Sequence, residues 1–106
     1  MKDDNVKDPI GLVPPAIIRD MAKTLEFGAR KYGIWNWRDD GANTAHMRTY
    51  DSVLRHLLSY ADGEDIDSES GLSHLSHAAT QLIILMTHIK EHPEMDNRYR
   101  RKECPK

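Results

Sequence analysis

Apolar residues recur every three or four positions in three separate segments of this chain. These segments are residues 14–32, 44–62 and 72–92, and the spacing is the one at which side chains return to the same face of an α-helix. No internal repeat and no low-complexity tract separates them. The pattern therefore predicts an all-α domain, a small helical bundle of three main helices.

Local signals predict where these helices begin and end. Pro14 and Pro15 suit the first turn of the first helix, and Gly33 suits the stop after its last turn. Thr44 is a good N-cap for the second helix, and Pro93 ends the third. We therefore expect an N-terminal arm over residues 1–13, a helical domain over 14–93, and a polar, basic and mobile tail over 94–106.

Each expected helix carries one apolar stripe, and we expect these stripes to be buried. Hydrophobic residues make up 39% of the chain and charged residues 30%, so the core that one chain can form is thin. Assembly into a homo-oligomer, such as a larger bundle, buries more of the stripes. The stripes are Ile17, Ile18, Met21, Ala22, Leu25 and Tyr32; Met47, Tyr50, Val53, Leu54, Leu57, Leu58 and Ala61; and Leu75, Ala79, Leu82, Ile83, Met86 and Ile89.

Charge and cysteine content exclude several kinds of partner. With 15 basic and 17 acidic residues the net charge is −2, so no overall field attracts nucleic acid or a membrane surface. The N-terminus lacks the apolar segment of a signal peptide, and no apolar run is long enough to span a bilayer. Cys104 is the single cysteine, as is usual in a reducing interior. We expect a cytoplasmic protein with no membrane partner and no stable nucleic-acid partner.

Histidines follow the third helical segment along one stripe. His74, His77, Gln81 and His88 are spaced by three, four and seven residues, and this stripe borders the apolar face. Two histidines at positions i and i+3 of a helix can ligate one metal ion. Half-exposed helix histidines without a ligand are the ordinary alternative.

An acidic connector precedes this helix and holds Glu64, Asp65, Asp67 and Glu69. Carboxylates this close repel one another unless they are solvated or share a cation. Oxygen ligands favour Mg²⁺ or Mn²⁺, while added imidazoles shift the preference toward Mn²⁺, Fe²⁺, Co²⁺ or Zn²⁺. A solvated loop that complements the helix dipole is the alternative.

His56 lies about two helical turns before the connector and can point at the same junction. Its neighbour Arg55 lies four residues after Asp51, which can hold the guanidinium or form a surface ion pair with it. The convergence of these features predicts a divalent-metal site. The candidate ligands are His56, Glu64, Asp67, His74 and His77.

The loop between the first two helices carries both tryptophans, Trp35 and Trp37, among polar residues. Aromatic residues in such a loop either pack it onto the core or form a stacking wall for a flat ligand such as a base.

Three sequence motifs follow one another along the chain: N-x-K-D-x-x-G, G-A-x-K-Y-G-x-x-N-W, and R-H-L followed by G-E-x-x-D and S-G-x-x-H-L-x-H-A. The matching residues are Asn5, Lys7, Asp8 and Gly11; Gly28, Ala29, Lys31, Tyr32, Gly33, Asn36 and Trp37; and Tyr50, Arg55, His56, Gly63, Glu64, Asp67, Ser70, Gly71, His74 and His77. In these motifs, over residues 5–90, the chain resembles a small phage-associated family of dATP/dGTP diphosphohydrolases.

The resemblance implies hydrolysis of a purine deoxynucleoside triphosphate to the monophosphate and pyrophosphate, in the host cytoplasm. It also implies kinship with the all-α MazG-like pyrophosphohydrolases, whose sites use an E-x-x-E pair and an E-x-x-D pair. Here Glu64 and Asp67 form one such pair, whereas Glu91 and Glu94 are separated by Pro93. In this chain histidines then stand where those relatives have carboxylates.

The roles that follow are hypotheses. Glu64 and Asp67 act in catalysis, and Lys31 and Arg55 bind the departing diphosphate. Trp37 and Tyr32 stack the base, while Asn36 reads its edge or holds the loop. A non-catalytic phage protein that sequesters a nucleotide is the alternative, and a small helical interaction module is a third.

Overall fold

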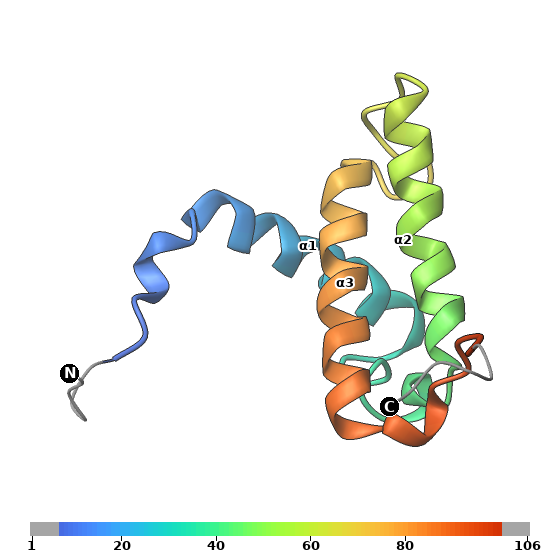
Figure 1. Ribbon diagram of the computed structural model, residues 1–106. Coiled ribbons are helices and arrows are strands. Elements are labelled where there is room, and N and C mark those ends of the chain that lie inside the picture. The colour runs from blue at the N-terminus through green and yellow to red at the C-terminus, as the bar shows by residue number, and fades with distance from the viewer. Residues whose placement is uncertain (1–6, 101–106) are drawn as a thin grey trace.

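The computed structural model describes residues 7–100 and is all-α, as the sequence predicts (Figure 1). Three long helices follow one another: α1 (Pro15–Tyr32), α2 (His46–Ala61) and α3 (His74–Glu91). Short 3₁₀ helices lie before, between and after them, at Ile10–Leu12, Asp40–Ala42 and Pro93–Met95. The only extended pairing in this range is a single bridge between Ile66 and Ser73, within the acidic connector.

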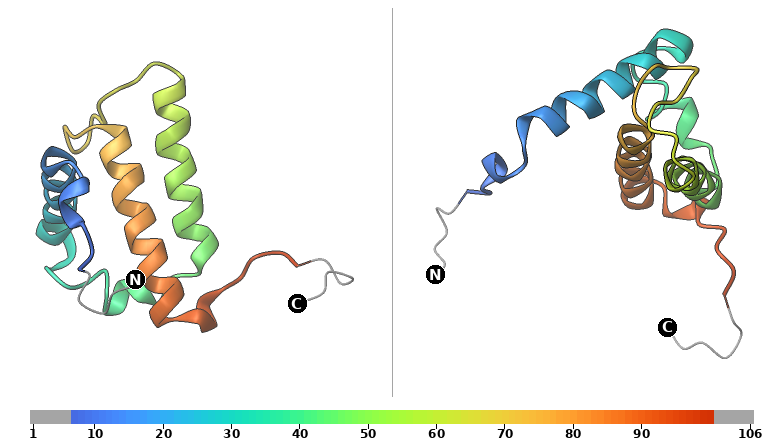
Figure 2. Two further views of the ribbon diagram at one scale, coloured as in Figure 1. Left: turned by 60° about the vertical axis from the view of Figure 1, so that its left-hand side comes forward. Right: turned by 90° about the horizontal axis from the view of Figure 1, so that it is seen from above.

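Helices α2 and α3 lie side by side in antiparallel directions and make the largest contact of the fold (Figures 1 and 2). Helix α1 packs against α3 with its C-terminal half, while its N-terminal half projects away from both other helices. The C-terminal half of α1 and the loop after it cover one side of the α2–α3 pair. The fold is more extended than usual, because its radius of gyration is 16.4 Å, whereas about 13 Å is usual for a domain of about 100 residues.

The helix ends match three of the four predicted signals, because α3 also stops before Pro93. Pro15 is the first residue of α1, and the chain leaves this helix at Gly33, whose φ of +103° favours glycine. The predicted N-cap at Thr44 is wrong: α2 begins at His46, with no side-chain cap from its own N-terminal residues. Instead, the side chain of Asn97 accepts a hydrogen bond from the Met47 backbone N–H at 3.0 Å. A distant segment therefore supplies the acceptor that Thr44 was expected to supply.

Helix α3 has a conventional N-cap at Ser73. Its Oγ accepts the backbone N–H of Ser76 at 2.9 Å, which satisfies one of the free donors of the first turn. We expect Ser73→Ala to lower the free energy of unfolding by about 1 kcal/mol, measured by urea denaturation. Ser68→Ala, in the exposed connector, is the matched control and should leave the unfolding midpoint unchanged; equal losses in both variants would contradict the capping role.

The predicted burial of the apolar stripes is wrong for the single chain. Among the described residues, only Ala42, Val53 and Ala78 are fully buried apolar residues. The other buried residues of these two helices are polar, and they are His46, Thr49, His74, His77, Thr80 and His88. The stripe residues that remain exposed on α2 and α3 include Tyr50, Leu54, Leu57, Leu58, Leu75, Leu82, Met86 and Ile89.

The domain limits at residues 13 and 93 stay predictions. The structure adds that residues following Pro93 continue along the end of the bundle, where Asn97 contacts α2. No helix within residues 7–100 combines the length and apolar character needed to cross a membrane.

Candidate functional site

A cavity of about 290 Å³ lies between α1, the loop after it, and the two antiparallel helices. Four residues predicted to bind substrate line it from α1 and the loop: Lys31, Tyr32, Asn36 and Trp37. Three residues predicted to hold metal line it from the other side: His56, Asp67 and His77. Segments far apart in the sequence therefore meet around one space.

Three imidazoles gather at one end of this cavity. Nδ1 of His56 lies 2.9 Å from Nδ1 of His74. The His56 ring also stacks on His77, with ring centroids 4.6 Å apart and planes 8° from parallel. His74 and His77 point the same way because they are one helical turn apart on α3, and both are buried.

Glu64 contacts one imidazole of this group, that of His74. Its carboxylate lies 3.0 Å from Nε2 of His74 and accepts from Nε2–H; in a neutral ring with this tautomer, Nδ1 carries the lone pair. Nδ1 of His74 therefore either accepts a hydrogen bond from His56 or, together with a lone pair on His56, faces a cation.

The connector is an ordered turn that presents Asp67. The Asp67 carboxylate accepts a hydrogen bond from the Ser70 backbone N–H at 3.0 Å, and the Ser70 hydroxyl lies 2.6 Å from Nε2 of His77. The backbone N–H of Gly71 donates to the Asp67 carbonyl, with a φ of +75° that an L-residue with a side chain rarely adopts. This turn brings the Asp67 carboxylate to 3.8 Å from His77.

The pKa shifts of His56, His77 and Asp67 favour the forms of these side chains that bind cations. Burial, followed by the charges of His77 and His74, lowers the pKa of His56 below its ordinary value. Burial also lowers the pKa of His77, against the opposing effect of Asp67. For Asp67, burial acts to raise the pKa, but the hydrogen bonds from Ser70 and the nearby histidines outweigh it, and the pKa is lowered. Neutral imidazoles and an ionised carboxylate are the forms that ligate metals.

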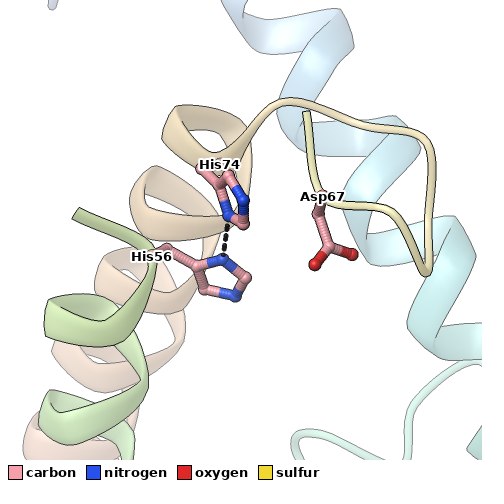
Figure 3. A group of neighbouring side chains, drawn as sticks. All are labelled: His56, Asp67 and His74. Carbon is pink, nitrogen blue, oxygen red and sulfur yellow. Dashed lines mark hydrogen bonds between the residues drawn. The ribbon is translucent and has the colours of Figure 1, made fainter. Parts of the chain in front are cut away.

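His56, Asp67 and His74 form a group that can hold one metal ion (Figure 3). They come from α2, the connector and α3, and one ligand atom of each lies within 4.8 Å of the others. Two nitrogen ligands with bonds of about 2.1 Å at right angles are about 3.0 Å apart. The 2.9 Å between the two Nδ1 atoms is close to this spacing and is also a hydrogen-bond distance, so the group is a candidate site for a divalent ion.

Lys31 lies at the same end of the cavity and meets the connector. Its ammonium pairs with the Glu69 carboxylate at 2.8 Å and lies 5.1 Å from the centre of the Phe27 ring. The hydrogen bond to Glu69 is the largest influence on Lys31 and raises its pKa. A phosphate that binds Lys31 must therefore compete with Glu69.

Trp37 forms the far end of the cavity and is anchored to α3. Nε2–H of His88 donates to the Trp37 carbonyl at 2.7 Å, and the centroids of the His88 and Trp37 rings are 6.0 Å apart. The loop approaches itself closely at Gly41, where a Cβ would lie 2.8 Å from the Asn36 carbonyl oxygen. Trp37 therefore both packs the loop onto α3 and lines the cavity, so packing and ligand stacking are compatible roles for this residue. Trp35, by contrast, is exposed.

Three predicted site residues do not line the cavity. Arg55 is exposed on α2, while Glu64 and His74 bond to each other directly beside the lining. Conversely, Thr80 and Gln81 line it and were not predicted as site residues. Only Gln81 had a signal in the sequence that pointed to the site, because it lies on the histidine stripe four residues after His77.

This fold and site define a small all-α domain with a histidine–carboxylate pocket. Residues 1–98 match the family described as "dATP/dGTP diphosphohydrolase, N-terminal", and the chain belongs to that family, as the motifs predict. A protein of Salmonella phage PMBT28 named dATP/dGTP diphosphohydrolase is 34% identical over 98 residues, which cover 92% of this chain and 32% of that protein. The chain thus spans about a third of that relative's length. No solved structure matches it.

Proposed function

We propose that this chain binds a purine deoxynucleoside triphosphate in the cavity and hydrolyses it to the monophosphate and pyrophosphate. The observation that carries the proposal is the convergence of His56 and Asp67 with Lys31 and Trp37 around one space. The family and the name of the phage relative favour the same substrate class.

The proposed metal ligands are His56, Asp67 and His74, with His77 beside them. When bound, a divalent ion supplies neutralisation of phosphate charge and an acidified water. Mg²⁺ or Mn²⁺ suits the carboxylate, and the imidazoles also allow Fe²⁺, Co²⁺ or Zn²⁺. Glu64 orients the His74 ring by accepting its Nε2–H, which leaves Nδ1 facing His56.

The remaining roles belong to the chain itself. Lys31 exchanges Glu69 for a phosphate oxygen and supplies one positive charge. Trp37 offers its ring face to the base, and Asn36 holds the loop that carries it through its carbonyl, which accepts from Gly41. Arg55 stays a proposed diphosphate ligand that must reach the site from the exposed side of α2.

The test is to incubate the purified chain with each deoxynucleoside triphosphate and Mg²⁺ or Mn²⁺. We expect deoxynucleoside monophosphate and pyrophosphate from dATP and dGTP, with loss of product on adding EDTA. Absence of turnover with every nucleotide, together with no metal binding by calorimetry, would reject the proposal.

A non-catalytic nucleotide-binding function is the second candidate. It is favoured by the closed hydrogen-bonded arrangement of His56, His74 and Glu64, which satisfies these groups by protein contacts alone. Nucleotide binding that EDTA does not weaken, with no product formed, is the result that selects this candidate.

We also propose that a second copy of the chain covers the exposed apolar side of α2 and α3. Figure 2 shows α1 on one side of this pair and no further long helix on the other. Leu54, Leu82 and Met86 are 38%, 44% and 60% exposed, and each copy has the same uncovered surface.

Lys31→Gln should raise KM for dATP about ten-fold, because a charged hydrogen bond to phosphate is lost. Glu69→Gln should lower KM, since it removes the group that competes for Lys31. Steady-state kinetics measure both. Lys23→Gln, an exposed lysine on the same helix, is the control, and an effect equal to that of Lys31→Gln would contradict the assignment.

A further inference from the structure

Gln81 presents an unused amide to the cavity. It lies one helical turn beyond His77 on α3 and lines the same space. Among residues 7–100, no side-chain hydrogen bond engages this amide, although it is half-buried. A polar group in this position is available to a ligand.

Thr80, its neighbour in the lining, is a second polar group without a partner. Its hydroxyl is buried and bonds to nothing in the described part of the chain. Thr24 and Thr87, by contrast, donate to the backbone carbonyl four residues before them. The Thr80 hydroxyl is therefore buried and unsatisfied, a state that costs free energy, whereas the half-buried amide of Gln81 stays accessible from the cavity.

The position of Gln81 along α3 lies between the two ends of the cavity. It is four residues from His77, about 6 Å along the helix axis, and seven residues from His88, about 10 Å. His77 belongs to the histidine end, and His88 holds Trp37. A nucleotide with its phosphates at the histidines and its base toward Trp37 has the edge of its base at Gln81.

We propose that Gln81 reads the Watson–Crick edge of a purine base, an inference that rests on the proposed nucleotide hydrolysis. The amide offers one acceptor and one donor side by side. It matches adenine by accepting from the amino group and donating to N1. Rotated by 180°, it matches guanine by donating to O6 and accepting from N1–H. One residue therefore accepts both purines, and the shorter reach of a pyrimidine leaves the amide unpaired.

Gln81→Glu separates the two bases. An ionised carboxylate only accepts hydrogen bonds, so it pairs with the N1–H and N2–H of guanine but faces the N1 lone pair of adenine. We expect the ratio of kcat/KM for dGTP to that for dATP to rise about ten-fold or more, since a bidentate pair discriminates by this amount. The ratio is insensitive to repulsion of the triphosphate, because both substrates carry the same phosphates.

Two further variants complete the experiment. Gln81→Leu should lower kcat/KM for both purines and leave their ratio near that of the wild type. Asn43→Asp, an amide-to-carboxylate change at an exposed position outside the cavity, should change nothing. A dGTP-to-dATP ratio in Gln81→Glu that is unchanged, or that shifts toward dATP, overturns the proposal.

Failure of the proposed function is recognised separately. If the wild type hydrolyses neither purine nucleotide, the hydrolase proposal fails, and the dissociation constants of dATP and dGTP are compared in its place. A rise in relative affinity for dGTP in Gln81→Glu then supports base reading by Gln81, and an unchanged ratio rejects it.

Discussion

Replacing His56 by alanine is expected to abolish nucleotide hydrolysis and weaken metal binding in the same variant. His56 lies 2.9 Å from His74, stacks on His77 and lines the cavity, so its loss opens the cluster at its centre. Loss of a residue that merely supports a ligand costs about ten- to a hundred-fold in metal affinity or activity. Because His56 is a proposed metal ligand itself, we expect kcat of His56→Ala to fall about a hundred-fold or more.

His92→Ala is the matched control for this prediction. His92 is the C-cap residue that follows α3, it lies outside the cavity lining, and its ring pairs with Glu94. Steady-state rates and titration of Mn²⁺ into both variants should show wild-type values for His92→Ala. Wild-type turnover by His56→Ala would remove the histidine cluster from the proposed site.

Replacing Leu82 by glutamate is expected to separate the proposed oligomer into monomers. Leu82 is 44% exposed on the uncovered side of α3, near Leu75 and Met86 on the same stripe. Burying an unpaired carboxylate in an apolar contact costs several kcal/mol. Sedimentation velocity should show an assembly for the wild type and a monomer for Leu82→Glu at the same concentration.

Tyr99→Glu tests whether any exposed apolar-to-acidic change has this effect. Tyr99 is 87% exposed and lies outside all helices, so this variant should sediment like the wild type. A wild-type chain that is monomeric at high micromolar concentration would contradict the proposed second copy.

Part of the candidate site was predictable because the chemistry is local. His74 and His77 are one helical turn apart, and the connector that carries Asp67 directly precedes them, so their convergence follows from sequence spacing. The position of His56 was predictable too, because it lies about two helical turns before the connector and can point at the same junction. The sequence did not show that Gln81 lines the cavity, because a helix stripe does not show which of its members faces a cavity formed with α1.

The capping of α2 shows a different limit. Thr44 has the residue type of an N-cap, yet Asn97 accepts the hydrogen bond from the first turn. Intrinsic preference for a cap is about 1 kcal/mol, which is small enough for packing at the end of the bundle to override.

The sequence by itself determined the three helices and the position of the connector, since helical periodicity, proline and glycine act within a few residues. Only the tertiary structure decided which helix faces meet. The buried residues of α2 and α3 are mostly histidines and threonines, His56, His77 and Thr80 line the cavity, and apolar stripe residues of both helices remain exposed. Periodicity identifies an apolar face but not its partner, because burial depends on what packs against that face.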